Sequence, residues 1–382
     1  MNLSIIGIGT AGNKASINLI EKGIIGKENI HLLNTTLKDI PEEYKKDGNM
    51  VHKFSSILGG CGKEPTKGHK HMLSAIRNKQ IDLSSFITER TQEVVIVTST
   101  GGGTGCGATP LVAKYFIQLG LPVHVFAFIP FGDEARELNN TLSFFKNMDD
   151  NIILHTIRNE DYLDYTNDYS AAEESANDDF AKQIEILTGS KMIASSQNID
   201  DTDMYKVSTT TGYQDIQHIP LVNVKNEELF NKTIKDAFDN IKCMEYEPTS
   251  KRLAVIINIA DKAVIDDKLE VIKRYTGEPF ETFRHIQYNE DDEEYIDIIA
   301  SGMNFPKKGI IDINKKYKKL KEKMNSKSNS FDDIFSDIDM GDEEEFDMDI
   351  KTMNNPKDVL NFFRDIDEQP KSVKKENEME EY

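Results

Sequence analysis

The chain has 382 residues and a formal net charge of −20, so it is long enough for two domains with real cores and a tail. Such an acidic chain is poorly suited to direct binding of nucleic acid or an anionic membrane surface, because affinity for nucleic acid comes mainly from neutralising phosphates. Its three cysteines lack metal-ligand spacing, and it has neither an 18-residue apolar run nor a secretion signal, which predicts a cytoplasmic protein.

Apolar runs alternate with helical patterns over the first 160 residues. Five runs are predicted to be buried strands, at 2–7, 29–34, 93–100, 121–130 and 151–157. Helical patterns between them cover 70–80, 105–119 and 133–147. This alternation predicts an α/β fold in which helices cover both faces of a parallel sheet.

The pattern changes after residue 160. Residues 170–189 predict a long connecting helix, with Ser170 as its N-cap and Gly189 as its stop. A second, smaller α/β unit is expected beyond it. Its predicted strands are 218–224, 252–259, 281–289 and 294–302, and its predicted helices are 226–243 and 262–275.

The C-terminal part is strongly charged. Residues 307–327 carry nine lysines and predict a helix, whereas residues 331–350 hold ten acidic residues and no basic one. The acidic block predicts a disordered tail. Within it, 355–367 is either part of a solvated tail or a docking peptide. The predicted division is 1–170, 171–205 (central helix and following loop), 206–306, 307–330 and 331–382.

Two glycine loops each follow a strand and open a helix. "GIGTAGN" (7–13) has the spacing of a dinucleotide fingerprint, but Asn34 stands where that fingerprint needs an acidic residue. "TSTGGGTGCG" (98–107) is no P-loop, because Ala108 and Thr109 replace the required Lys and Ser/Thr. Together the loops predict that backbone N–H groups hold a polyphosphate at one sheet edge. "GGCGKEPTKG" (59–68) is a weaker third loop that could cover the terminal phosphate.

These loops resemble those of the tubulin/FtsZ superfamily, whose signature is similar to "GGGTGCG". "GIGTAGNKA" and "GGCGKEPTKG" resemble two further phosphate loops of FtsZ. The resemblance implies binding of GTP or GDP. It assigns one side of the phosphates to Gly9, Thr10, Ala11, Gly12 and Asn13, and the other side to Gly101, Gly102, Gly103, Thr104 and Gly105.

Other motifs extend the resemblance. "IPFGDEAR" implies a ribose contact from Glu134, while "RNEDYL" and "SANDDF" imply guanine contacts from Asn159 and Asn177. Two positions depart from the family. Leu138 stands where FtsZ has an arginine, and Arg136, two residues earlier, is its candidate substitute. Glu173 replaces an aromatic that stacks on guanine, so this stacking either comes from elsewhere, with Tyr169 as the candidate, or is absent.

"NIDDTDMYKV" resembles the synergy loop of FtsZ. The resemblance implies that Asp200 and Asp203 act on the GTP of the next subunit in a head-to-tail filament, with Mg²⁺ held mainly by phosphate oxygens and water rather than by a protein metal site. Taken alone, the same aspartates and Asp201 would instead form a helix N-cap in a solvated loop. His124, on an apolar strand, is expected to be a core histidine.

The sequence alone allows three functions. The chain most resembles TubZ-type tubulins of plasmids and phages, which implies a self-polymerising GTPase that segregates DNA through a DNA-binding adaptor on its C-terminal tail. A phage tubulin that positions viral DNA is the alternative, and deletion of 331–382 would separate the two. A dinucleotide-dependent oxidoreductase is the remote alternative, which the second glycine loop and Asn34 oppose.

Overall fold

The computed structural model describes residues 2–55, 59–163, 168–193, 198–221, 226–259, 266–288 and 293–328. The predicted acidic tail at 331–382, with its possible docking peptide at 355–367, lies outside these ranges. So do the start of the predicted helix 262–275 and the end of the predicted strand 218–224.

Ten strands form one sheet in the order β3-β2-β1-β4-β5-β6-β7-β10-β8-β9. They are β1 (Leu3–Ile8), β2 (Ile30–Asn34), β3 (Val51–Lys53), β4 (Glu93–Ser99), β5 (Val123–Ile129), β6 (Ile153–Arg158), β7 (Gly212–Pro220), β8 (Arg252–Ile259), β9 (Glu281–Tyr288) and β10 (Tyr295–Met303). The seven strands from β3 to β7 in this order, which include β1 and β2, pair with their neighbours in parallel. Strand β10 is antiparallel to both β7 and β8. The predicted α/β fold with a largely parallel sheet is therefore confirmed.

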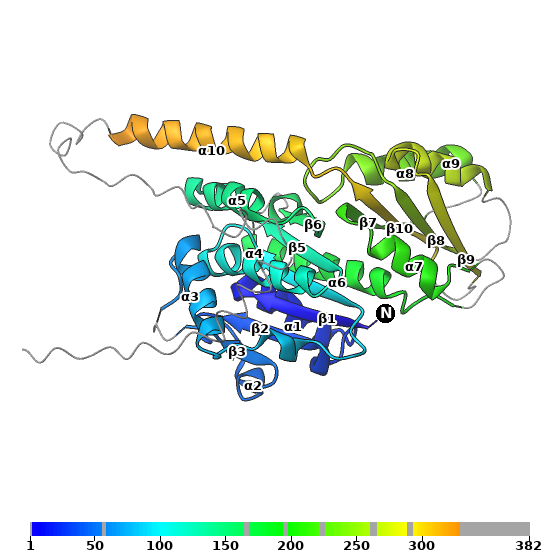
Figure 1. The fold of residues 1–382 in the computed structure, drawn as a ribbon. Coiled ribbons are helices and arrows are strands. Elements are labelled where there is room, and N and C mark those ends of the chain that lie inside the picture. The colour runs from blue at the N-terminus through cyan, green and yellow to red at the C-terminus, as the bar shows by residue number, and fades with distance from the viewer. Residues whose placement is uncertain are drawn as a thin grey trace, which may run out of the picture.

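Helices cover both faces of this sheet (Figure 1). The first face packs against α3 (Pro65–Arg77), α4 (Gly103–Gln118), α5 (Ala135–Asn147), α8 (Glu227–Asp239) and α9 (Asp266–Thr276). The second face packs against α1 (Gly9–Glu21), α6 (Tyr169–Thr188) and α7 (Asp201–Ser208). The lysine-rich helix α10 (Lys307–Ser328) packs on α5 through Ile313 and Leu138, and a short α2 (Glu42–Lys45) follows β2.

The central helix α6 begins earlier than expected. Its N-cap is Asp168, whose carboxylate accepts hydrogen bonds from the backbone N–H groups of Ser170 (3.0 Å) and Ala171 (3.1 Å). The assignment of Ser170 as N-cap was therefore wrong, because an acidic cap two residues upstream already satisfies these donors. The predicted stop is confirmed, since Gly189 adopts a left-handed conformation at the helix end.

Two further boundaries differ for identifiable reasons. Helix α3 starts at Pro65 rather than near residue 70, because proline suits the first helical turn although it precedes the apolar periodicity. Strand β7 starts at Gly212 rather than at residue 218. Its first half contains buried polar residues such as Gln214 and Asp215, so it lacks the apolar pattern by which a buried strand is predicted. Among the described residues, no helix combines the length and apolarity that a bilayer span needs.

Candidate functional site

A cavity of about 550 Å³ lies where the parallel strands end. Its floor includes Ile8, Asn34 and Ser99, the last residues of β1, β2 and β4. Five chain segments contribute its remaining lining, which comprises Gly9, Thr10, Ala11, Thr35, Thr36, Asp39, Gly60, Cys61, Gly62, Lys63, Gly102, Gly103, Thr104, Gly105 and Glu137. Ligands of open α/β sheets bind at this edge, so the cavity is the candidate ligand site.

The two helices that start at the cavity have no side-chain caps. Helix α1 begins after Ile8 and α4 begins after Gly102, and neither N-cap residue accepts a hydrogen bond through its side chain. Neither helix has an acidic residue in its first turn. The N-terminal N–H groups and the positive dipole ends of both helices are therefore available to an anion in the cavity.

Steric requirements explain most of the glycines in these loops. A Cβ on Gly12 would lie 2.1 Å from the Val97 carbonyl oxygen, and one on Gly103 would lie 2.5 Å from the Glu64 nitrogen. A Cβ on Gly105 would lie 2.3 Å from the Thr98 hydroxyl oxygen. These glycines let backbone segments pack closely, whereas a Cβ on Gly102 would meet no atom within 4 Å. Close packing of the backbone therefore requires Gly12, Gly103 and Gly105, whereas Gly102 leaves open space.

The third glycine loop brings a cation to the cavity. Lys63 pairs with Glu134, and its ammonium lies 2.8 Å from the Glu137 carboxylate. Although burial disfavours the charged ammonium, these two ion pairs raise the pKa of Lys63. Lys63 is the one cationic side chain among the described residues that line the cavity. The loop thus supplies an ammonium group that can exchange its carboxylate partners for an anionic ligand.

Polar residues at the end of β2 were missed from the sequence. The Thr10 hydroxyl donates to Asp39 (2.8 Å), and the hydroxyls of Thr35 and Thr104 are 3.1 Å apart. Among the described residues, the buried Asn34 amide nitrogen has no hydrogen-bond partner. In the sequence, Asn34 stands out only as the residue at the position where a dinucleotide fingerprint needs a carboxylate. Its place at the end of a parallel strand, next to the first glycine loop, is the sequence feature that indicates a position at the cavity.

Several predicted residues do not line this cavity. Gly12 and Asn13 lie within α1, and Gly101 precedes the N-cap of α4. Glu134 precedes α5 and pairs with Lys63. Asn159 begins a 3-10 turn after β6, and Asn177 is half-buried on α6. Within the ranges that the structure describes, both amide atoms of buried Asn13 and the buried Oδ1 of Asn159 have no hydrogen-bond partner. The structure brings the phosphate loops together and leaves these residues outside the cavity wall.

The departures from the family also have defined places. Leu138 is 1% exposed and packs in the core beside α10, so it is a structural residue here. Arg136 is exposed, and its guanidinium lies 3.7 Å from Glu64. Tyr169 is 46% exposed and packs edge-on against Phe131, with ring centres 4.6 Å apart. Within the described ranges, no group of three or more His, Cys, Asp or Glu side chains could hold a metal ion.

Asp200 and Asp203 lie at the start of α7, away from the cavity. The Asp200 carboxylate accepts a hydrogen bond from the Asp203 N–H (2.8 Å), and Asp203 pairs with Lys206 (2.9 Å). At the other end of α7, the Ser208 hydroxyl donates to Glu93, the first residue of β4 (2.9 Å). Helix α7 is therefore anchored at the amino edge of the sheet, and the cavity lies at the carboxyl edge, roughly 20 Å away along β4.

Comparisons with known proteins agree with this geometry. Residues 2–167 match the sequence profile of the Tubulin/FtsZ family, GTPase domain. The cell division protein FtsZ of Mycoplasmopsis pulmonis is 27% identical over 323 residues, which cover 80% of this chain and 78% of that protein.

Two solved structures share the fold. TubZ of Clostridium botulinum phage c-st has a TM-score of 0.64 and 19% identity, over 84% of this chain and 98% of its own. TubZ of Bacillus thuringiensis serovar israelensis, in a GTPγS-form protofilament, has a TM-score of 0.70 and 16% identity, over 85% and 94% respectively. The cavity thus occupies a domain with the fold and sequence profile of GTP-hydrolysing proteins.

Proposed function

Since the chain belongs to the tubulin/FtsZ superfamily and carries its GTP-hydrolysing domain in residues 2–167, we propose that it assembles head to tail into filaments that move plasmid or phage DNA. The observation that carries the proposal is the placement of the phosphate cavity and of Asp200 and Asp203 at opposite edges of one sheet. The match to a GTPase domain argues against the alternative function of a dinucleotide-dependent oxidoreductase.

The cavity fits the triphosphate of GTP. Two uncapped helix N-termini and the open backbone at Gly102 can donate hydrogen bonds to phosphate oxygens. Lys63 and the Thr104 hydroxyl add side-chain donors. We assign the nucleotide site to the residues predicted from the sequence, with Glu134, Asn159 and Asn177 toward the nucleoside. Mg²⁺ would be held mainly by phosphate oxygens and water, where it neutralises negative charge.

Hydrolysis needs a second subunit in this proposal. The cavity lining contains Asp39 and Glu137, but Glu137 is paired with Lys63 and Asp39 accepts from Thr10. Asp200 and Asp203 on the far edge reach a cavity only when another copy stacks along the strand direction. Such a contact is heterologous and extends into a filament. There the two carboxylates would orient the attacking water, which is the positioning that phosphoryl transfer requires.

The DNA-related role rests on charge and on the fold likeness to TubZ. A net charge of −20 disfavours direct contact with DNA, so a separate DNA-binding adaptor would dock on the C-terminal tail, in the cytoplasm of a bacterial host. A phage tubulin that positions viral DNA is the second candidate. Deletion of 331–382 separates them, because loss of adaptor binding alone favours the first and loss of polymer favours the second.

The test of shared hydrolysis is a concentration series. GTP turnover per molecule should rise steeply at the concentration where light scattering reports assembly, and a slowly hydrolysed analogue should keep the polymer intact. Equal turnover per molecule in dilute, unassembled protein would contradict a site completed by a neighbour.

A further inference from the structure

A second cavity, of about 210 Å³, lies between the two halves of the sheet. Strands β6 and β7 pair only through Ile153–Gly212 and Leu154–Tyr213. The next residues of each strand, His155 on β6 and Gln214 on β7, line the cavity, together with residues of α6 and α8. The cavity therefore opens where the two strands separate, and no part of the proposed nucleotide site lines it.

Two buried polar atoms of the residues that line it have no hydrogen-bond partner within the part of the chain that the structure describes. They are His155 Nδ1 and Gln214 Oε1, and each of these residues is 1% exposed. The amide nitrogen of Gln214 donates to the Val207 carbonyl (3.2 Å), so its oxygen is left as an acceptor. Unsatisfied buried polar atoms are costly, so a donor in the cavity would stabilise both groups.

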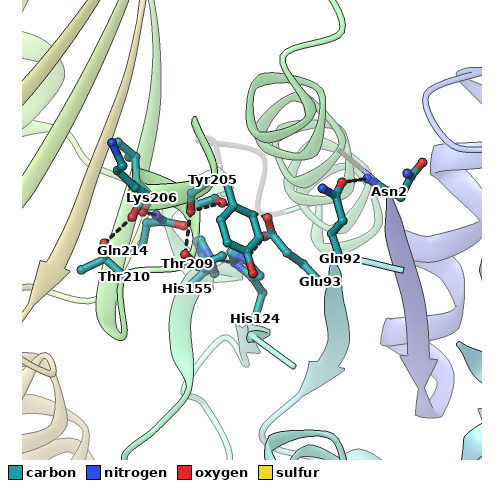
Figure 2. Close-up of polar contacts among 12 residues, drawn as sticks. Asn2, Gln92, Glu93, His124, His155, Tyr205, Lys206, Thr209, Thr210 and Gln214 are labelled. Atoms are coloured by element: carbon teal, nitrogen blue, oxygen red, sulfur yellow. Dashed lines mark hydrogen bonds and ion pairs between the residues drawn. The ribbon is translucent and has the colours of Figure 1, made fainter. Parts of the chain in front are cut away.

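A buried chain of contacts links His155 to Glu93 through His124 (Figure 2). The Glu93 carboxylate lies 2.7 Å from His124 Nε2, and His124 Nδ1 lies 3.0 Å from His155 Nε2. We assign the ring proton of a neutral His155 to Nε2, which then donates to His124 Nδ1 and leaves His155 Nδ1 as an acceptor. Burial and the neighbouring His124 lower the pKa of His155 well below its usual value, which agrees with a neutral ring. The expectation that His124 is a core histidine is also confirmed.

Both orphan groups connect to the same helix. The Gln214 amide donates to the Val207 carbonyl of α7. The chain of contacts from His155 ends at Glu93, which accepts a hydrogen bond from the hydroxyl of Ser208, the residue that follows Val207. Two hydrogen-bond paths thus run from the cavity to consecutive residues at the end of α7. The start of the same helix carries Asp200 and Asp203.

The remaining wall favours a positively charged ligand. Asp179 and Asp215 are among the residues that line the cavity, and the carboxyl group of each accepts hydrogen bonds from neighbouring side chains. Burial raises the pKa of Asp215, and a cation beside its carboxylate would counter that effect. Lys242 also lines it, but its ammonium lies over the Tyr162 ring, 4.4 Å from the ring centre. A ligand with several N–H donors and a positive charge matches two orphan acceptors beside two carboxyl groups.

We propose that this cavity is a regulatory site for a small protonated amine, which bridges His155 Nδ1 and Gln214 Oε1 and thereby fixes the position of α7. The regulatory part rests on the function proposed above, because it depends on Asp200 and Asp203 acting on a neighbouring subunit. Binding itself does not depend on that function.

The test uses 1,4-diaminobutane as the probe, the full chain in its GDP-bound, unassembled state, and butane-1,4-diol as an uncharged control. Calorimetry should show one saturable site for the diamine. Its affinity should fall at least tenfold in Gln214→Met and stay unchanged in Asn240→Ala. Asn240 also lines the cavity, and its side-chain amide donates to the Asp236 carbonyl of α8 (2.8 Å). Hydrogen exchange of the α7 amides at 201–208 should slow when the diamine binds.

A second measurement covers the case in which Gln214→Met fails to fold. In the wild-type protein, the ¹⁵N resonance of His155 Nδ1 should shift on addition of the diamine. Absence of binding, equal binding of the diol, an unmoved resonance, or a crystal structure with diamine in which only water fills the cavity would each overturn the proposal. None of these readouts involves GTP turnover, so they are independent of whether hydrolysis needs a neighbour.

Discussion

The Lys63 ammonium lies 2.8 Å from the Glu137 carboxylate, in a cavity wall that also presents two uncapped helix N-termini. We expect Lys63→Ala to weaken GTP binding by roughly 10- to 150-fold, because a hydrogen bond to a charged group contributes about 1.5–3 kcal/mol. The loss should be smaller for GDP, which carries less negative charge. Titration with a fluorescent nucleotide measures both affinities.

Lys67→Ala is the matched control for that variant. Lys67 lies in the first turn of α3, pairs with Glu64 at 2.7 Å and does not line the cavity. Lys63→Arg should restore part of the affinity. Similar nucleotide affinity in Lys63→Ala and Lys67→Ala would remove Lys63 from the phosphate site.

The neighbouring glycines Gly102 and Gly103 should respond differently to alanine. A Cβ on Gly103 would lie 2.5 Å from the Glu64 nitrogen and 2.8 Å from Cys61 Cβ, so Gly103→Ala should lower the free energy of unfolding by about 1–3 kcal/mol. A Cβ on Gly102 would have no described atom within 4 Å, so Gly102→Ala should change the free energy of unfolding by less than about 0.5 kcal/mol. Because Gly102 lines the cavity, that variant should nevertheless bind GTP more weakly. Urea unfolding and nucleotide titration of both variants decide this, and unchanged binding by Gly102→Ala would mean that its backbone does not face the phosphates.

The sequence predicted the sheet and the phosphate loops because their signals are local. Apolar runs such as 93–100 and 252–259 coincide closely with β4 and β8. The glycine loops mark the carboxyl ends of strands, and parallel strands bring those ends together. The position of the cavity, and the presence of Gly9 and Gly102–Gly105 in its lining, could therefore be predicted from the sequence.

The polar interior was not predictable in the same way. Glu93 and His155 lie in runs that are predicted to be buried strands, but the sequence does not indicate that their side chains are joined through His124. Their contacts join strands that are some 30 residues apart, and the partner Ser208 lies 115 residues from Glu93. Sequence periodicity carries no information on such long-range pairs. The same limitation hid the first half of β7, where Gln214 is buried by a contact to α7.

Buried His31 should make the protein sensitive to acid. Burial, together with the nearby His52, lowers the pKa of His31 from 6.5 to about 4. The unfolded chain therefore binds a proton below about pH 6.5 that the folded protein refuses until about pH 4, so stability falls as the pH falls through this window. For His31 alone the loss at pH 5 is about 2 kcal/mol. Urea midpoints at pH 7 and pH 5 should differ less in His31→Gln than in the wild type, and equal pH dependence would contradict this assignment.

The final prediction separates the two roles of Asp200, as the cap of α7 and as a group that acts on a neighbour's GTP. Asp200→Asn retains an acceptor for the Asp203 N–H, and Asn caps helices as well as Asp does. Stability should therefore hold, whereas Asp200→Ala should lose about 1 kcal/mol. If the carboxylate orients the attacking water, Asp200→Asn should still bind GTP and assemble, while turnover falls by about 10²- to 10⁴-fold.

Asp201→Asn is the control for that experiment, since Asp201 is an exposed residue of the same first turn. Mixed assembly gives a stricter test, because each active site combines two subunits. A Lys63→Ala subunit that binds GTP poorly but keeps Asp200 should restore turnover to Asp200→Asn subunits in mixed filaments. If mixing restores nothing although both variants enter the polymer, or if Asp200→Asn alone hydrolyses GTP at the wild-type rate, Asp200 does not act across the interface.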